Sequence, residues 1–122
     1  MGDDERNAYL SAILTEWMNV YTLSLKFRVA FLDAQGQVDD GDEIHEYISR
    51  LTRLIGELKP HIDGRSDLGP QLASLPADFE NIEKYYDDMN LLQKEDGSWN
   101  VTEIYRIEKI LRKALQAIPG MR

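Results

Sequence analysis

Two stretches of the chain show a clear helical spacing of apolar residues. From about Asp42 to Leu58 the apolar positions step by four and three residues, which is typical of an amphipathic helix that Pro60 ends or kinks; they are Ile44, Ile48, Leu51, Ile55 and Leu58. A second such pattern follows Asn100, a favourable helix cap, and continues until Pro119; it consists of Ile104, Ile107, Leu111, Ala114 and Ile118. Both patterns predict helices that bury one face.

A third helix is predicted to begin near Pro76, a residue suited to the first helical turn. Its apolar positions keep helical spacing as far as the turn expected at Asp96-Gly97; they are Phe79, Ile82, Tyr86, Met89 and Leu92. Tyr85 and Tyr86 are adjacent, so one of them must leave the buried face, and we expect Tyr85 to be partly exposed. The segment 60–76 reads as a loop with one short helical turn over 68–75.

The first part of the chain, from Tyr9 to Leu32, has apolar residues on more sides than a surface helix needs. Residues 23–31 alternate as a strand would, but the chain offers no second strand for pairing within itself. A helix that continues to about Ala34 is favoured, and a short intermolecular strand over 23–32 is the alternative. The prediction is an all-α antiparallel bundle of four main helices with a long apolar first helix, formed by a single domain over residues 1–122.

A long first helix with surplus apolar surface needs cover from a second subunit, so we expect a homodimer. The residues expected at its interface are apolar or aromatic: Trp17, Tyr21, Leu25, Phe27, Phe31 and Tyr85. The aromatic residues of this set, together with Tyr86, could instead line a ligand pocket between helices, although such residues more often form the core.

The charge and composition narrow the classes of function. The formal net charge of −8 disfavours nucleic-acid binding, because phosphate contacts need clustered Lys and Arg. The chain has no cysteine, which excludes disulfides and thiolate metal sites and suits the cytoplasm. Its acidic start lacks the layout of a signal peptide, and charges interrupt the one candidate for a membrane span, so no membrane association is expected.

Paired carboxylates on two of the predicted helices are the strongest candidates for chemistry; they are Glu43, Glu46, Glu80, Glu83 and Asp87. These five residues resemble the acidic pairs of the all-α nucleotide pyrophosphohydrolases, a resemblance that implies a Mg²⁺ site and nucleotide hydrolysis. The gap between the two pairs is longer than that family's pattern. The residues also lie opposite the apolar stripes, where charged side chains are the ordinary solvated face of a helix.

The last predicted helix carries a basic face made of Arg106, Lys109 and Lys113, a candidate site for an anionic ligand or an acidic partner. No nucleophile motif or phosphate-binding glycine loop accompanies it, and no cofactor is expected. The sequence therefore favours a small acidic, non-enzymatic interaction or regulatory module that self-associates through its first helix and can bind a further protein partner. The alternatives are the Mg²⁺-dependent hydrolase, a small-ligand bundle, and an acidic inhibitor that mimics nucleic acid.

Overall fold

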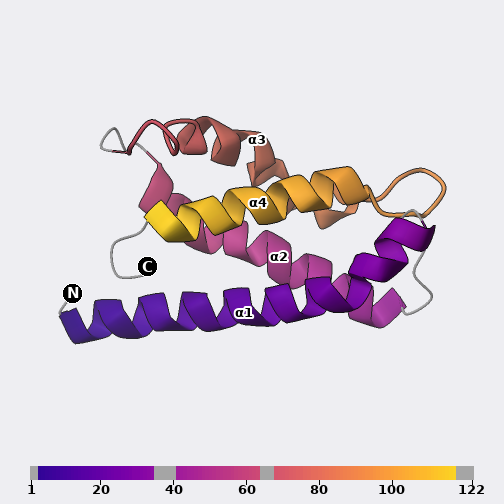
Figure 1. The fold of residues 1–122 in the computed structure, drawn as a ribbon, viewed down its shortest axis with the longest axis horizontal. Helices are drawn as coiled ribbons and strands as arrows, with labels where there is room; N and C mark the ends of the chain where they lie inside the picture. Colours follow the sequence, from indigo (N-terminus) through magenta and orange to yellow (C-terminus); the bar gives the residue numbers. More distant parts are fainter. Residues whose placement is uncertain (1–2, 35–40, 64–67, 118–122) are drawn as a thin grey trace.

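The computed structural model describes residues 3–34, 41–63 and 68–117, and in these ranges the protein is an all-α bundle without a strand. Its elements are α1 (Asp3–Ala34), α2 (Gly41–Ile62), α3 (Leu75–Asp87), the short 3₁₀ helix η1 (Met89–Leu92) and α4 (Val101–Ala117). Successive α-helices run in opposite directions along the long axis of the molecule (Figure 1). No described helix combines the length and the apolar character needed to cross a membrane.

The helix α2 lies at the centre of the bundle and contacts α1, α3, η1 and α4. Its apolar stripe is fully buried, as expected from the spacing of Ile44, Ile48, Leu51, Ile55 and Leu58. From the other side the core is completed by Phe79 and Ile82 of α3 and by Ile104, Ile107 and Leu111 of α4. One continuous core thus holds the described elements together.

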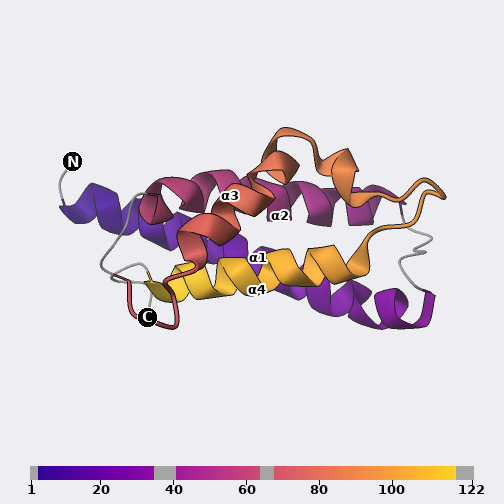
Figure 2. The same cartoon turned by 90° about the horizontal axis from the view of Figure 1, so that it is seen from above.

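The helix α1 packs mainly against α2 and lies along the edge of the bundle. Seen from above, it crosses the other helices at an angle, so that its N-terminal part follows α2 and its C-terminal part approaches α4 (Figure 2). The contacts agree, because Tyr9 stacks near His61 of α2 with ring centroids 5.7 Å apart, whereas Arg28 reaches Glu108 of α4 at 3.6 Å. One side of α1 consequently has no covering helix among the described residues.

Several predicted boundaries are confirmed. The chain remains helical from Asp3 to Ala34, so the alternative of a strand over 23–32 is wrong. The side chain of Asn100 caps α4 by accepting a hydrogen bond from the Glu103 amide at 3.3 Å. Pro60 lies inside α2, which continues to Ile62. The loop predicted from residue 60 therefore begins only after Ile62; Pro60 removes one backbone hydrogen bond, and the helix continues for two more residues beyond it. The last position of the apolar pattern in α4, Ile118, lies outside the described residues.

The third helix is shorter than predicted. It ends at Asp87, where the Asp88 carboxylate accepts a hydrogen bond from the Asn90 amide at 3.0 Å and starts η1. The chain then turns back through a bridge between Gln93 and Trp99, with Gly97 in the left-handed region at a φ of 88°. The expectation of one continuous helix as far as the Asp96-Gly97 turn was wrong, because Asp88 supplies a local cap that apolar spacing does not reveal.

Candidate functional site

The exposed side of α1 carries large apolar side chains in a regular pattern. Leu14 is 40% exposed, Met18 55% and Leu25 50%, and with half-buried Tyr21 they are spaced by four, three and four residues. This spacing places the four side chains in one line along the helix, as in the contact line of a coiled coil. The opposite side of α1, with Ile13 and Val20, is buried against the rest of the bundle.

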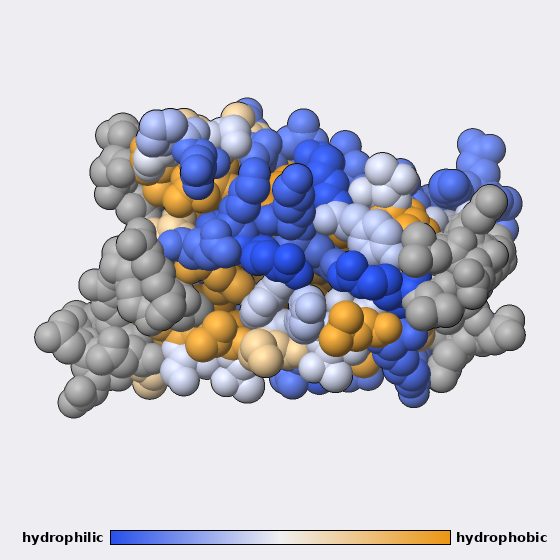
Figure 3. All heavy atoms as spheres, in the orientation of Figure 1, coloured by the Kyte–Doolittle hydropathy of each residue, from blue (hydrophilic) through white to orange (hydrophobic). Residues whose placement is uncertain are grey.

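The same side of α1 has no charge over most of its length. Between Asn7 and Leu25 the sequence contains one charged residue, Glu16, and its carboxylate is held by Arg50 of α2 at 3.0 Å. The exposed residues here form what we call the uncharged strip of α1: Ala8, Ser11, Ala12, Leu14, Thr15, Met18, Asn19, Thr22 and Leu25. Figure 3 shows apolar and weakly polar side chains along much of α1, whereas the surface over α4 is mostly hydrophilic.

Two hydroxyl groups of the uncharged strip are already bonded within the helix. Thr15 Oγ1 donates to the Ser11 carbonyl at 3.0 Å, and Thr22 Oγ1 donates to the Met18 carbonyl at 2.9 Å. Such bonds turn the hydroxyl towards the helix backbone and leave the methyl group outward. The strip is therefore less polar than its sequence suggests, and this surface is the first candidate functional site.

The predicted interface residues fall into different environments. Trp17 and Phe27 are buried within their own chain, so their side chains belong to the core. Leu25 is exposed, and Tyr21 is half-buried beside Arg112, whose guanidinium carbon lies 5.6 Å from the ring centroid. The side chain of Phe31 lies outside the described part of the chain. The expected exposure of Tyr85 was wrong: Tyr85 is 6% exposed and Tyr86 is 56% exposed, because the line of Phe79 and Ile82 extends to Tyr85.

Charged residues of α1 beyond the strip are joined to the neighbouring helices. Lys26 forms an ion pair with Glu43 of α2, and Arg28 forms one with Glu108 of α4. Glu16 is paired with Arg50 of α2 in the same way. The charged side chains described in the middle and C-terminal parts of α1 therefore contact helices of their own chain.

A polar cluster lies where α1, α2 and α4 meet, with Tyr47 and Glu108 buried and Arg28 and Tyr105 partly exposed. The Tyr47 hydroxyl donates a hydrogen bond to the Glu108 carboxylate, and Arg28 lies between Glu108 and the ring of Tyr105, 5.4 Å from its centroid. Burial raises the pKa of Glu108, although the hydrogen bond from Tyr47 and the charge of Arg28 oppose the shift. Burial likewise raises the pKa of the Tyr47 phenol far above its usual range. The apolar spacing of α4 does not predict that Glu108 points inward.

The carboxylates of the predicted metal site either form ion pairs with nearby cations or are exposed on α3. Glu43 pairs with Lys26, Glu46 with Arg50 at 3.1 Å, and Glu83 with Lys59 at 2.6 Å, while Glu80 and Asp87 are exposed on α3. Within residues 3–34, 41–63 and 68–117, no three acidic or histidine side chains lie close enough together to hold a metal ion.

The predicted basic face of α4 is only partly available to an external group. Arg106 donates through Nε to Glu103 at 3.0 Å and through its terminal nitrogen to Asn81 of α3 at 3.0 Å. The hydrogen bond to Glu103 is the largest cause that raises the pKa of Arg106 and lowers that of Glu103. Lys109 is exposed and Lys113 is half-buried. One of the three predicted cations therefore serves to fix α4 against α3.

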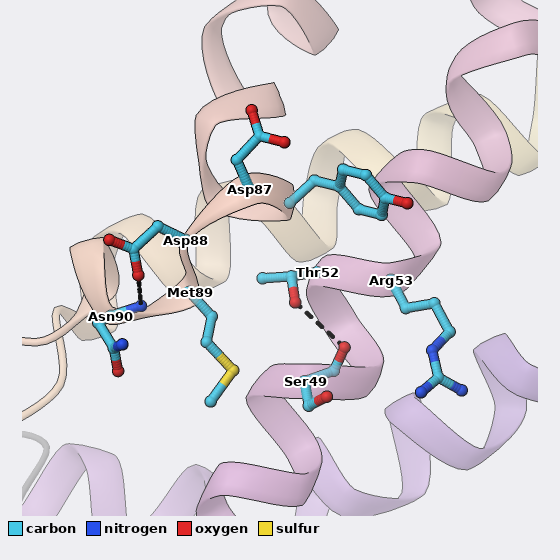
Figure 4. A pocket seen from close by; sticks show the side chains of 8 residues that line it. Ser49, Thr52, Arg53, Asp87, Asp88, Met89 and Asn90 are labelled. Carbon is cyan, nitrogen blue, oxygen red and sulfur yellow. Dashed lines mark hydrogen bonds between the residues drawn. The ribbon is translucent and has the colours of Figure 1, made fainter.

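A second candidate site lies between α2 and the end of α3, where the surface is hollowed by about 400 Å³ (Figure 4). Ser49, Thr52 and Arg53 line it from α2, and residues 86–90 line it from α3 and η1. In the close view Asp87 points away from α2, and Met89 lies across from Ser49 and Thr52. Apolar spacing does not predict such a hollow, although a glycine within a helix (Gly56) signals that another group approaches α2 closely.

Comparison with known proteins assigns neither site. No family model matches the chain, and no curated protein or solved structure matches it.

Proposed function

We propose that the protein is a small non-enzymatic interaction module whose working unit is a homodimer formed through the uncharged strip of α1. The observation that carries the proposal is the combination of exposed Leu14, Met18 and Leu25 with the absence of charge between Glu16 and Lys26. The outer face of a helix that stays in water normally carries charged side chains. An outer face with apolar residues in a line and no charge is instead typical of a helix that packs against another.

The charge of the molecule favours a second copy as the partner. The formal net charge of −8 makes two copies repel each other at most relative orientations. In a two-fold dimer the same patch of each subunit meets its own copy, so a charged patch would face like charges. The uncharged strip avoids this repulsion. A partner of opposite charge, by contrast, would find nothing on the strip to attract it.

The length of the strip is sufficient for helix pairing. From Ala8 to Leu25 it extends for about 26 Å at the usual rise of 1.5 Å per residue. Small residues, among them Ala8, Ser11 and Ala12, flank the apolar line and allow two helix backbones to approach closely. Two such strips can pack with their apolar side chains interdigitated, as in helical bundles.

The test is the molar mass in solution as a function of protein concentration, measured by sedimentation equilibrium. We expect the wild-type protein to reach twice the chain mass of 14.1 kDa. Met18→Glu places a carboxylate in the middle of the strip and should give a monomer. Leu91→Glu is the matched control, because Leu91 of η1 is 54% exposed, close to the 55% of Met18, and lies away from α1. A wild-type protein that stays monomeric, or a Met18→Glu variant that still dimerises, would contradict the proposal.

A further inference from the structure

Three adjoining hollows lie between α2 and α3. In the ribbon view, α3 is on the opposite side of α2 from α1 (Figure 1). The middle hollow, of about 570 Å³, shares Tyr86 and Asp87 with the hollow of Figure 4. It shares Lys59, Asp63 and Glu83 with a third hollow of about 430 Å³ that reaches Pro76. We call these adjoining hollows together the α2–α3 groove.

The charge that lines the α2–α3 groove is predominantly negative. Five carboxylates line it, namely Asp63, Glu80, Glu83, Asp87 and Asp88, against two cations, Arg53 and Lys59. Lys59 Nζ lies 2.6 Å from Glu83 and 3.8 Å from Asp63 and offsets part of their charge, and the lining still has three more carboxylates than cations. The groove is thus a surface that attracts positive charge.

An exposed aromatic ring stands in the middle of the groove. Tyr86 is 56% exposed and lies against Gly56 of α2, where a Cβ atom would come within 2.4 Å of the ring. The absence of a side chain at Gly56 therefore determines where this ring rests. A tyrosine ring attracts a cation placed over its face, and the neighbouring Asp87 adds a carboxylate on the same part of the groove.

We propose that the α2–α3 groove binds a basic peptide segment of a partner protein, with an Arg or Lys side chain over Tyr86 and beside Asp87. The carboxylates are distributed along the groove rather than gathered around one point, and no three of the described ones can share a metal ion. A string of cations on an extended chain fits that distribution, because alternate side chains of a strand-like segment point the same way about 7 Å apart. The net charge of −8 adds a long-range attraction for such a partner.

The probe is a fluorescein-labelled octapeptide of alternating arginine and alanine, and its binding is followed by fluorescence anisotropy at low and at physiological salt. We expect Tyr86→Ala to weaken binding about two- to five-fold, the range given by an exposed cation–π contact. Asp87→Asn should weaken it as well. The matched control is Glu95→Gln, because Glu95 is also exposed but does not line the groove and the substitution removes the same charge.

Gly56→Ala gives a second, independent check. The added methyl group must displace the Tyr86 ring, so peptide binding should fall as it does in Tyr86→Ala. The helix itself should be no less stable, because alanine is the better helix former. Circular dichroism during heating separates this outcome from misfolding.

Specific outcomes would overturn the proposal. Equal losses in Asp87→Asn and Glu95→Gln would show attraction by the overall charge alone. Spermine that competes with the peptide at equal concentration would show a site for small polyamines. Binding that Met18→Glu removes, while Tyr86→Ala leaves it unchanged, would place the peptide on α1. The groove does not depend on dimerisation. Peptide binding by the monomeric Met18→Glu variant, or by a wild-type protein that proves to be monomeric, therefore supports the groove whatever the outcome of the homodimer test.

Discussion

The two longest helices, α1 and α2, differ in how their apolar residues are distributed. In α2 these residues occupy one stripe, and Leu51, Leu54 and Leu58 are fully buried. In α1 they surround much of the helix, so that Ile13 and Val20 are buried while Leu14, Met18 and Leu25 remain exposed. A single exposed leucine is common on protein surfaces. The absence of charge beside three such residues in a line is more informative, and it distinguishes the outer face of α1 from that of α2.

The two helices also differ in how they are attached to the rest of the bundle. The central helix α2 is held by the core on several sides, whereas α1 has one apolar contact face and, among its described side chains, three ion pairs to the neighbouring helices. Surface ion pairs contribute little to stability. We therefore expect α1 to be the more weakly held of the two in an isolated subunit, and dimerisation would compensate by covering its outer face.

The largest expected effect is the difference in stability lost when a buried leucine of α2 and an exposed leucine of α1 are each replaced by alanine. Leu54→Ala in α2 should lower the free energy of unfolding by about 3 kcal/mol, because it removes a fully buried side chain and leaves a cavity. Leu25→Ala in α1 should lower it by less than about 0.5 kcal/mol in the monomeric Met18→Glu background, because the side chain is half exposed there. Urea unfolding followed by circular dichroism measures both. Similar losses at the two positions would mean that Leu25 is buried within its own subunit.

The elements with strong periodicity could be predicted from the sequence. The apolar spacing of α2 and α4 and the cap Asn100 each describe a local preference that the tertiary structure keeps. The helical state of residues 23–31 followed from a wider consideration, the lack of any partner strand. The break after Asp87 could not be found in this way, because Phe79, Ile82, Met89 and Leu92 keep a common spacing through it. A short polar cap overrides that spacing.

Neither candidate site could be predicted in full. The surplus apolar surface of α1 was visible in the sequence, but the inward direction of Trp17 and Phe27 depends on the angle at which α1 crosses α2. Which of Tyr85 and Tyr86 is buried likewise depends on how α3 packs against its neighbouring helices. The α2–α3 groove and the buried Glu108 arise from the meeting of helices distant in the sequence, and a pattern within one helix does not contain that information.

An intermediate effect concerns the polar contact between α1 and α4, the cluster around Glu108. Burial raises the pKa of this carboxyl in the folded protein, so folding favours its protonated form. Its contribution to stability is complete below the ordinary glutamate pKa and is lost as the pH rises through the higher folded value. Glu108→Gln stays neutral at every pH. The stability of this variant relative to wild type should therefore increase from about pH 4 upward, starting near the unfolded glutamate pKa.

Urea unfolding of both proteins at a series of pH values measures this difference directly. Carboxyls whose pKa is lowered by folding, such as Glu103 and Asp96, give both proteins the same opposite trend, which cancels in the comparison. A difference that stays constant with pH would show that Glu108 titrates as an ordinary surface glutamate, and that α1 has no buried polar anchor at α4.

The smallest expected effect concerns the ion pair that joins α1 to α2. Arg50→Met removes the ion pair with Glu16 of α1 and also the pair with Glu46 of its own helix, and we expect a loss of about 1 kcal/mol because both pairs are partly exposed. Added salt should reduce the loss by screening the attraction. Arg53→Met is the matched control, because Arg53 lies one turn further along α2, is exposed, and should change stability less. A loss of several kcal/mol at Arg50 would mean that ion pairs, rather than the apolar face of α1, hold this helix to the bundle.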